Sequence, residues 1–304
     1  MTTTTPDGSD TRHSALWSPT PSPATAPRPA SSIAAGLLEA PDFPISTLSD
    51  VTPDWAWGGA DGAGVRVCVV DSGIDGSHPL VGAVQRSVTV RPDEQGEIQV
   101  IDCPAVDEAG HGTACAGIIR ALAPRSEISS AQVLTDGRHG SGAGLLAGLE
   151  WAVEERFEVI NLSLATTQAR FALPLHELAD RAFFRGILLV VSAHNRPVHS
   201  YPWTFASVVS VGSHDLTDPM TFYYNPKPPV EFHARGIQVP VAWPGGRTIQ
   251  TTGNSFAAPH IAGICALILS KHPWLTPFQL KTVLFLTAAN VAGRRSDLVG
   301  GRHD

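Results

Sequence analysis

Three residues far apart in this chain carry the side chains needed to attack an amide bond: the serine Ser255, the histidine His111 and the aspartate Asp71. A neutral serine hydroxyl is a poor nucleophile, so a histidine must accept its proton and a carboxylate must orient that histidine and stabilise its charge. Each residue alone has a simpler explanation, because Asp71 lies in a turn sequence and Ser255 could merely cap a helix. The presence of all three residues, in the order Asp, His, Ser, indicates a catalytic set more strongly than any one of them does.

The sequence around each of these residues predicts a regular element that would hold it. A β-branched apolar run predicts a buried strand that ends at Asp71. His111 lies at the start of a predicted helix, and Ser255 opens the apolar run 256–269, which also predicts a helix. Gly253 predicts a sharp turn before that helix. Unpaired N–H groups at a helix start favour negative charge that develops nearby.

Predicted strands and helices alternate along the chain, which indicates an α/β fold. The predicted strands are apolar throughout, as in a parallel sheet that is covered on both faces. Such a sheet places active sites at the carboxyl ends of its strands, where Asp71 falls. Two proline-rich stretches, 219–229 and 240–244, predict surface loops. The predicted strands span 64–70, 128–134, 159–164, 187–192 and 208–211, and the predicted helices span 113–122, 143–157, 175–184 and 276–289.

Composition excludes two classes of partner. The 304 residues are 43% hydrophobic and 16% charged, which is typical of a soluble globular protein. Lys and Arg number 21 against 28 for Asp and Glu, and the net charge of -7 offers no attraction to nucleic acid or to an anionic membrane. The longest apolar runs are shorter than the roughly 20 residues that span a bilayer. We expect neither nucleic acid nor membrane as a partner.

The chain is expected to divide into a tail, one large domain and a short end. Residues 1–45 are rich in Pro, Ser and Thr and predict a disordered tail without the pattern of a secretory signal. Residues 46–293 predict the catalytic domain, and the charged residues 294–304 are expected to fray. The four cysteines show no C-x-x-C pairing, so we expect reduced thiols and a cytoplasmic location.

Three motifs in this order resemble the subtilase family of subtilisin-type serine proteases. The resemblance extends over residues 50–290 and implies an α/β, three-layer fold, with a mostly parallel central sheet and helices on both faces. It implies peptide-bond hydrolysis, with Asp71 orienting His111, His111 acting as general base and then acid, and Ser255 as nucleophile. The matching segments are 69–75 (VVDSGID), 110–113 (GHGT) and 253–260 (GNSFAAPH).

The same resemblance implies an oxyanion donor and two segments that bind substrate. An asparagine after an apolar strand supplies one donor in subtilases, and Asn195 matches it. Substrate in this family lies as an extended strand between two enzyme segments, so we expect a peptide or protein partner bound by backbone pairing. Asn195 could instead be a loop asparagine that bonds its own backbone. The two segments could instead be a flexible glycine loop and the end of a strand. The matching segments are Gly140-Ser141-Gly142 and Ser163-Leu164-Ala165.

The chain departs from the family pattern around the expected cleft. Asn254 and Phe256 replace a usual threonine and methionine beside Ser255, and the ring of Phe256 is expected to narrow the pocket. His194 and Arg196 flank Asn195 in place of a glycine and an acidic or small residue. Ala165 stands where glycine usually lines the first specificity pocket. These changes add bulk or positive charge, so we expect a preference for small or acidic side chains before the cut.

No cofactor and no obligatory metal follow from the sequence. The segment 117–124 runs into the next strand without the Asp or Asn cluster of a calcium loop. Cys115 lies one helical turn after His111, as in the thiol-containing branch of the family, which places a thiol beneath the histidine. We expect it to be a packed core cysteine that a mercurial could still reach. A metal-dependent hydrolase is disfavoured because H-E-x-x-H is missing from the sequence.

The family resemblance leaves three functions open. The short, proline-rich tail favours an intracellular processing protease, similar to the proteases that mature precursor peptides in ribosomal natural-product pathways. A general intracellular degradative protease is the second possibility. The third is a catalytically silent subtilase that acts as a peptide-binding module, since Asn254, His194 and Arg196 could obstruct the cleft.

Overall fold

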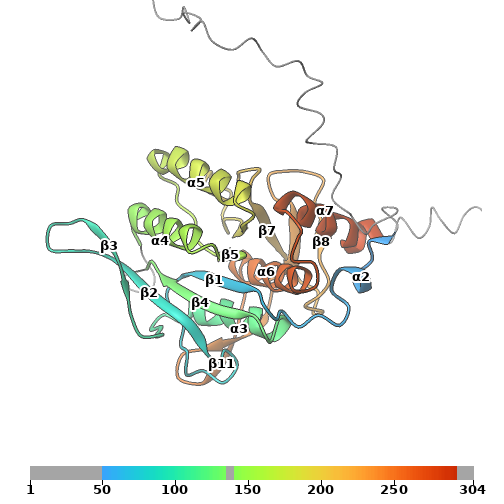
Figure 1. The fold of residues 1–304 in the computed structure, drawn as a ribbon, viewed down its shortest axis with the longest axis horizontal. Coiled ribbons are helices and arrows are strands. Elements are labelled where there is room, and N and C mark those ends of the chain that lie inside the picture. Colours follow the sequence, from blue (N-terminus) through green and yellow to red (C-terminus); the bar gives the residue numbers. More distant parts are fainter. Residues whose placement is uncertain (1–49, 135–139, 293–304) are drawn as a thin grey trace, which may run out of the picture. The chain divides into compact units, whose positions relative to one another are not determined.

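A computed structural model describes residues 50–134 and 140–292, and within them one mixed sheet forms the centre of the fold (Figure 1). Its strand order is β3-β2-β4-β1-β5-β6-β7-β9-β8. The strands from β2 to β9 pair in parallel, whereas β3 and β8 pair antiparallel at the two edges. The strands are β1 (Arg66–Asp71), β2 (Val84–Pro92), β3 (Ile98–Asp102), β4 (Glu127–Gln132), β5 (Val159–Leu162), β6 (Leu188–Ser192), β7 (Val209–His214), β8 (Tyr223–Tyr224) and β9 (Phe232–Arg235).

Helices cover both faces of this sheet. Helices α4 and α5 lie on one face, and α3 and α6 contact each other on the opposite face (Figure 1). The sheet and its helices therefore form three layers, as the family resemblance implies. The helices are α2 (Pro53–Trp57), α3 (His111–Leu122), α4 (Gly142–Glu154), the 3₁₀ turn η2 (Ala169–Phe171), α5 (Ala172–Phe184), α6 (Asn254–Lys271) and α7 (Pro277–Thr287).

The central strands are largely apolar because both of their faces are buried. In β1, Cys68 and Val70 pack into a core cluster with residues of α4 and α5. The alternate residues Val67 and Val69 are also fully buried and point to the other face, where α3 and α6 lie. Burial on two sides explains why the strand sequences lack alternation.

The helices and parallel strands predicted from the sequence are confirmed, with bounds that shift by a few residues. The loop prediction for 240–244 is wrong, because β10 (Val239–Trp243) pairs antiparallel with β11 (Arg247–Thr251) in a separate two-stranded sheet. Pro240 is tolerated there because an isolated ribbon leaves one edge of each strand unpaired. The predicted tail 1–45 and the whole of the predicted frayed end, 294–304, lie outside the described residues.

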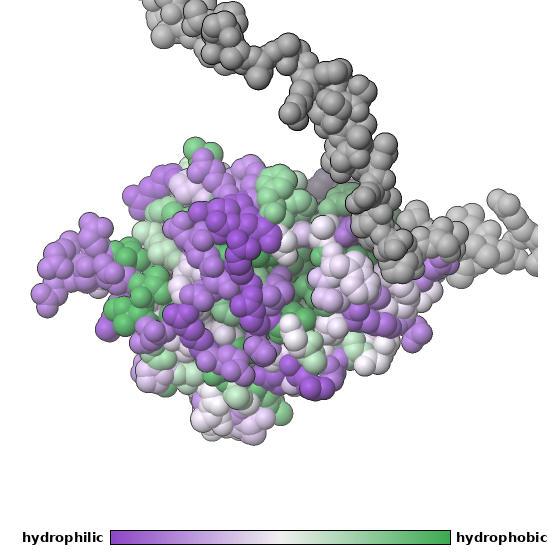
Figure 2. All heavy atoms as spheres, in the orientation of Figure 1, coloured by the Kyte–Doolittle hydropathy of each residue, from purple (hydrophilic) through white to green (hydrophobic). Residues whose placement is uncertain are grey.

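The β2–β3 hairpin, which the sequence analysis did not anticipate, extends beyond the helices. Figure 2 shows that its tip, which contains Asp93 and Glu94, is hydrophilic. Edge strand β3 exposes Val100 and Ile101. Among the described residues, α6 and the other helices lack the length and apolar character needed to cross a bilayer.

Candidate active site

Asp71 and His111 meet where β1 ends and α3 begins. The Nδ1 atom of His111 lies 2.8 Å from Oδ1 and 2.9 Å from Oδ2 of Asp71. Asp71 is completely buried, and the backbone N–H of Ser72 also donates to its carboxylate at 2.7 Å. Because both carboxylate oxygens face one ring nitrogen, the carboxylate fixes the orientation of the imidazole and favours the tautomer with a proton on Nδ1.

The charge of Asp71 sets the basicity of His111. Burial alone would lower the pKa of His111, because it disfavours the charged ring. The negative charge of Asp71 and contacts with Asp71 and Cys115 outweigh burial, so the pKa of His111 lies well above its ordinary value. The ring is thus prepared to accept a proton.

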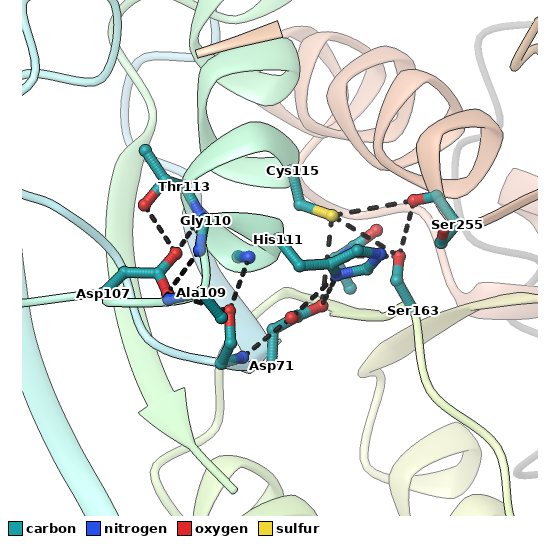
Figure 3. Close-up of polar contacts among 12 residues, drawn as sticks. Asp71, Asp107, Ala109, Gly110, His111, Thr113, Cys115, Ser163 and Ser255 are labelled. Carbon is teal, nitrogen blue, oxygen red and sulfur yellow. Dashed lines mark hydrogen bonds and ion pairs between the residues drawn. The ribbon is translucent and has the colours of Figure 1, made fainter. Parts of the chain in front are cut away.

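A second buried carboxylate, Asp107, holds the loop before α3. Its Oδ1 accepts from Gly110 N at 2.8 Å, and its Oδ2 accepts from Thr113 N at 3.0 Å and from Thr113 Oγ1 at 2.6 Å (Figure 3). Ser72 Oγ donates to the same carboxylate at 3.0 Å. Asp107 therefore caps α3 and ties its first turn to the end of β1. This role was not predicted from the sequence, because Asp107 lies four residues before His111 and not at the N-cap position, Gly110, where a capping side chain is expected.

Two glycines allow the approach of His111 to Asp71. Gly110 has a φ of +93°, and a Cβ at this position would lie 2.6 Å from the ring of Trp243. A Cβ at Gly112 would lie 2.0 Å from the carbonyl oxygen of Gly73. A side chain at Gly112 would push α3 away from the end of β1, and one at Gly110 would strain the backbone and collide with Trp243 of β10.

Ser255 is the second residue of α6 and shares a cleft with His111. The cleft has a volume of about 420 Å³ and is also lined by residues 192–196. The position before the helix is Gly253, which forms no side-chain cap, so the alternative that Ser255 serves as the N-cap is wrong. The backbone of Gly253 is extended, with φ 167° and ψ 154°, and needs no left-handed turn.

The hydroxyl of Ser255 forms no hydrogen bond within the described residues, whereas its carbonyl oxygen is firmly held. Ser163 Oγ donates to this oxygen at 2.9 Å, and Cys115 Sγ lies 3.6 Å from it (Figure 3). The structure therefore brings Asp71 and His111 into direct contact and places Ser255 in their cleft, with the serine–histidine hydrogen bond not formed. Such bonds are often long in free enzymes.

Cys115 lies beneath this pair, as its spacing from His111 predicts. It is completely buried, and its Sγ lies 4.0 Å from Asp71 Oδ2 and 3.7 Å from Ser163 Oγ. Burial raises the pKa of the Cys115 thiol. The ligand atoms of Asp71, His111 and Cys115 all lie within 4.8 Å of one another, so a thiophilic metal ion that entered here would compete for His111.

Asn195 lies in the cleft with its amide oxygen engaged. Its Oδ1 accepts from the backbone N–H of Asn254 at 2.9 Å. The side chain of Asn254 turns away: its Oδ1 accepts from the backbone N–H and the hydroxyl of Ser213, and its Nδ2 donates to His194 O at 3.3 Å. Asn254 thus ties the loop of Asn195 to α6 and β7 rather than obstructing the cleft.

The two predicted substrate segments face each other across a neighbouring cavity. This cavity has a volume of about 360 Å³ and is lined by Gly140, Ser141, Gly142, Leu164, Ala165 and His194, among others. Ser163 lies instead in the cleft around Ser255. Ser141 caps α4 by accepting from Gly144 N at 2.9 Å, so the glycine segment leads into a helix.

Three of the expected specificity residues line the cleft, and Phe256 does not. Ala165, His194 and Arg196 all line the cleft around Ser255. Phe256, expected to narrow the pocket, is only 5% exposed and packs with Ile118, Val239 and Val241. Its ring centroid lies 5.2 Å from that of His111. The expectation for Phe256 is wrong because α6 turns the residue after Ser255 into the core, where it supports the imidazole.

The fold and this site define a subtilisin-like serine endopeptidase, a hydrolase. The chain belongs to the subtilase family, whose pattern matches residues 62–301. It is 32% identical over 245 residues to subtilisin from Bacillus pumilus, a match that covers 76% of this chain and 86% of that relative. The match to subtilisin E of Bacillus subtilis (strain 168), also 32% identical, spans 62% of that protein's length.

Solved structures agree with this assignment. The crystal structure of a cold adapted subtilisin-like serine proteinase superposes with a TM-score of 0.58 at 28% identity, over 73% of this chain and 81% of that chain. Sphericase, at 22% identity, shares the fold with a TM-score of 0.62 over 74% of this chain and 83% of its own.

Proposed function

We propose that this enzyme is a cytoplasmic processing protease of narrow specificity that works through Asp71, His111 and Ser255. The observation that carries the proposal is the contact of His111 Nδ1 with both oxygens of Asp71, in a cleft that also holds Ser255. This arrangement leaves Nε2 of His111 as the atom available to the serine hydroxyl.

In the proposed reaction, His111 Nε2 takes the proton of Ser255 as Oγ attacks the substrate carbonyl carbon. Asp71 stabilises the imidazolium that forms. Asn195 Nδ2 and the backbone N–H of Ser255, at the start of α6, donate to the oxyanion of the tetrahedral intermediate. His111 then gives its proton to the leaving amine, and an activated water hydrolyses the acyl-enzyme by the same steps in reverse.

The substrate is proposed to lie as an extended strand between residues 140–142 and 163–165. These two segments line one cavity beside the Ser255 cleft, and backbone pairing there asks little of the substrate's side chains. Selectivity would then depend on the side chains that line the cavity next to the cut peptide bond. His194 and Ala165 line both this cavity and the Ser255 cleft, so they are the residues best placed to limit the size of the substrate side chain.

Charge supports a preference for small or acidic side chains before the cut. The described lining of the Ser255 cleft holds Arg196 and His194 and no carboxylate. Arg196 forms no ion pair with the described residues, so its charge is free to attract an acidic substrate. A cleft that accepts mainly small or acidic side chains suits the trimming of a defined precursor, such as a natural-product precursor peptide, better than it suits general protein degradation.

The cysteines support a cytoplasmic location. Cys68, Cys103, Cys115 and Cys265 are all unpaired thiols, as a reducing compartment favours. Fractionation of cells that express the tagged full chain tests this part of the proposal. Recovery of the enzyme outside the cytoplasm would overturn it.

A mixture-based peptide library tests the proposed specificity. We expect cleavage after Asp, Glu, Ala and Ser at rates at least tenfold above those after Phe, Tyr and Trp. Equal cleavage after large aromatic residues would favour the general degradative protease. Peptides that bind without being cut would favour the silent binding module, and either result would overturn the proposal.

A further inference from the structure

The carbonyl oxygen of Ser255 lacks the partner that a regular helix would give it. Ser255 is the second residue of α6, and a helical carbonyl oxygen normally accepts from the N–H group four residues later. For Ser255 that residue is Pro259, which lies inside α6 and has no N–H group. Because Ser255 is buried, its carbonyl oxygen needs a donor from outside the helix.

The hydroxyl of Ser163 supplies this donor. Its Oγ lies 2.9 Å from the carbonyl oxygen of Ser255, which can only accept a hydrogen bond (Figure 3). Nδ2 of Asn161 donates to the same Oγ at 3.2 Å. Asn161 is completely buried and Ser163 is 7% exposed, so both bonds are shielded from water. Asn161 thus holds the hydroxyl whose single proton points to Ser255.

Cys115 is the other side chain against this carbonyl oxygen, and it is the weaker donor. Its Sγ lies 3.6 Å from the carbonyl oxygen of Ser255 and 3.7 Å from Ser163 Oγ. A thiol is only a weak hydrogen-bond donor. Without the hydroxyl of Ser163, the carbonyl oxygen would therefore keep a thiol alone among the side chains that the structure describes.

Ser163 also belongs to a segment that is expected to bind substrate. It directly precedes Leu164 and Ala165, and all three line the cleft around Ser255. The substrate is proposed to pair with the backbone of this segment, which leaves the side chain of Ser163 free to hold Ser255. One residue therefore connects the substrate segment to the first turn of α6. A displacement of about 1 Å between reacting groups can lower a rate by about 10²-fold.

We propose that Ser163 is a positioning residue that fixes Ser255 relative to the bound substrate. Its hydroxyl holds the carbonyl oxygen of Ser255, and this contact fixes the first turn of α6, which carries the nucleophile, against residues 163–165. Ser163 acts through Ser255 and touches no reacting atom. The inference rests on the proposed role of Ser255 as the nucleophile.

Steady-state kinetics of Ser163→Ala on one peptide substrate test this role. The variant keeps the backbone that pairs with substrate and loses only the hydroxyl, so we expect kcat to fall by about tenfold or more and KM to change less than about threefold. An unchanged kcat, or a change confined to KM, would overturn the proposal.

Ser126→Ala is the matched control for the loss of a buried hydroxyl. Ser126 follows the far end of α3, and its Oγ donates to the carbonyl oxygen of Ala123 at 2.8 Å. The control thus removes a hydrogen bond of the same kind away from the cleft and should leave kcat and KM unchanged. A fall in kcat equal to that of Ser163→Ala would show a general effect of lost stability and would overturn the proposal.

Pro259→Ala offers a rescue that a merely structural role would not allow. It restores an N–H group four residues after Ser255, so the carbonyl oxygen regains a donor within α6. In this background, we expect Ser163→Ala to lower kcat by less than about threefold. Equal losses in both backgrounds would overturn the proposal. Circular dichroism checks that each variant folds, and the comparison of Ser163→Ala with Ser126→Ala decides the matter if Pro259→Ala does not.

Fluorophosphonate labelling distinguishes a failure of this inference from a failure of the proposed function. We expect the wild-type enzyme to be labelled on Ser255, and Ser163→Ala to be labelled more slowly by about tenfold or more. Labelling of both proteins at the same rate would overturn the positioning role alone. A wild-type enzyme that is not labelled would overturn the proposed function and this inference with it.

Discussion

The side-chain oxygen of Asn195 accepts a hydrogen bond from the backbone N–H of Asn254 at 2.9 Å. Since Asn254 directly precedes Ser255, this bond links the loop of Asn195 to the start of α6. With its oxygen engaged, the amide of Asn195 has only its Nδ2 donors to offer a substrate. This hydrogen bond between a side chain and the backbone therefore fixes the amide of Asn195 relative to the first turn of α6, which carries Ser255.

Replacing Asn195 should therefore reduce the chemical step more than binding. Asn195→Ala removes a donor that strengthens as the oxyanion forms, and losses of about 10²- to 10³-fold in kcat are typical for such a donor. We expect KM to change less than threefold. Steady-state kinetics on one peptide substrate measure both constants, and a change confined to KM would contradict the proposed role.

Asp107 should contribute to stability as well as to activity. Asp107→Ala leaves the buried N–H groups of Gly110 and Thr113 without their acceptor, which should lower the free energy of unfolding by more than about 2 kcal/mol. Asp102→Ala, which removes an exposed ion pair with Arg86, is the matched control and should cost less than about 1 kcal/mol. Urea denaturation measures both, and equal losses would show that Asp107 is not a capping residue.

The pH dependence follows from the raised pKa of His111. A general base must be neutral, so kcat/KM should rise with pH through a pKa above the ordinary histidine value. The same shift stabilises the fold below the ordinary pKa, and this contribution is lost as pH rises through the folded-state pKa. Activity should therefore rise over a pH range in which stability falls.

Asp71→Asn provides the control for this assignment. Without the carboxylate charge, the rising limb should move to lower pH and kcat should fall by about 10⁴-fold. A rising limb at the same pH in the wild type and in Asp71→Asn would show that another group titrates.

Much of the fold and the candidate site follows from local sequence. Apolar runs such as the one that ends at Asp71 predict strands, since burial on both faces favours apolar side chains at successive positions. The motifs around His111 and Ser255 are short, so their elements can be predicted without knowledge of distant contacts. The position of Asn195 after β6 follows in the same way.

Features that depend on distant contacts could not be predicted. Strand β10 contains Pro240, which suggests a loop until its partner β11 is known. Phe256 follows Ser255 directly, but only the direction of α6 shows that its ring supports His111 from the core.

A thiol reagent should distinguish Cys115 from the other cysteines. A mercurial that reaches Sγ of Cys115, 4.0 Å from Asp71, should displace His111 and abolish peptidase activity. Cys115→Ala should resist this inactivation, whereas Cys103→Ala, which removes the more exposed thiol, should remain sensitive. Inhibition that persists unchanged in Cys115→Ala would contradict the placement.

The bulk and charge beside the cleft should control specificity. His194→Gly should enlarge the cavity shared with Ala165 and raise cleavage after Phe at least tenfold. Arg196→Gln should lower cleavage after Glu at least fivefold and leave cleavage after Ala unchanged. Peptides that differ only at the residue before the cut measure these ratios, and unchanged ratios in both variants would place the specificity determinants elsewhere.

The central claim is that Asp71 and His111 activate Ser255 as a nucleophile. Intact-mass analysis after reaction with a fluorophosphonate tests it most directly. We expect one adduct per chain on Ser255, complete loss of labelling in Ser255→Ala, and labelling slowed at least 10³-fold in His111→Ala. An unlabelled wild-type enzyme, or an adduct that survives in Ser255→Ala, would contradict the claim.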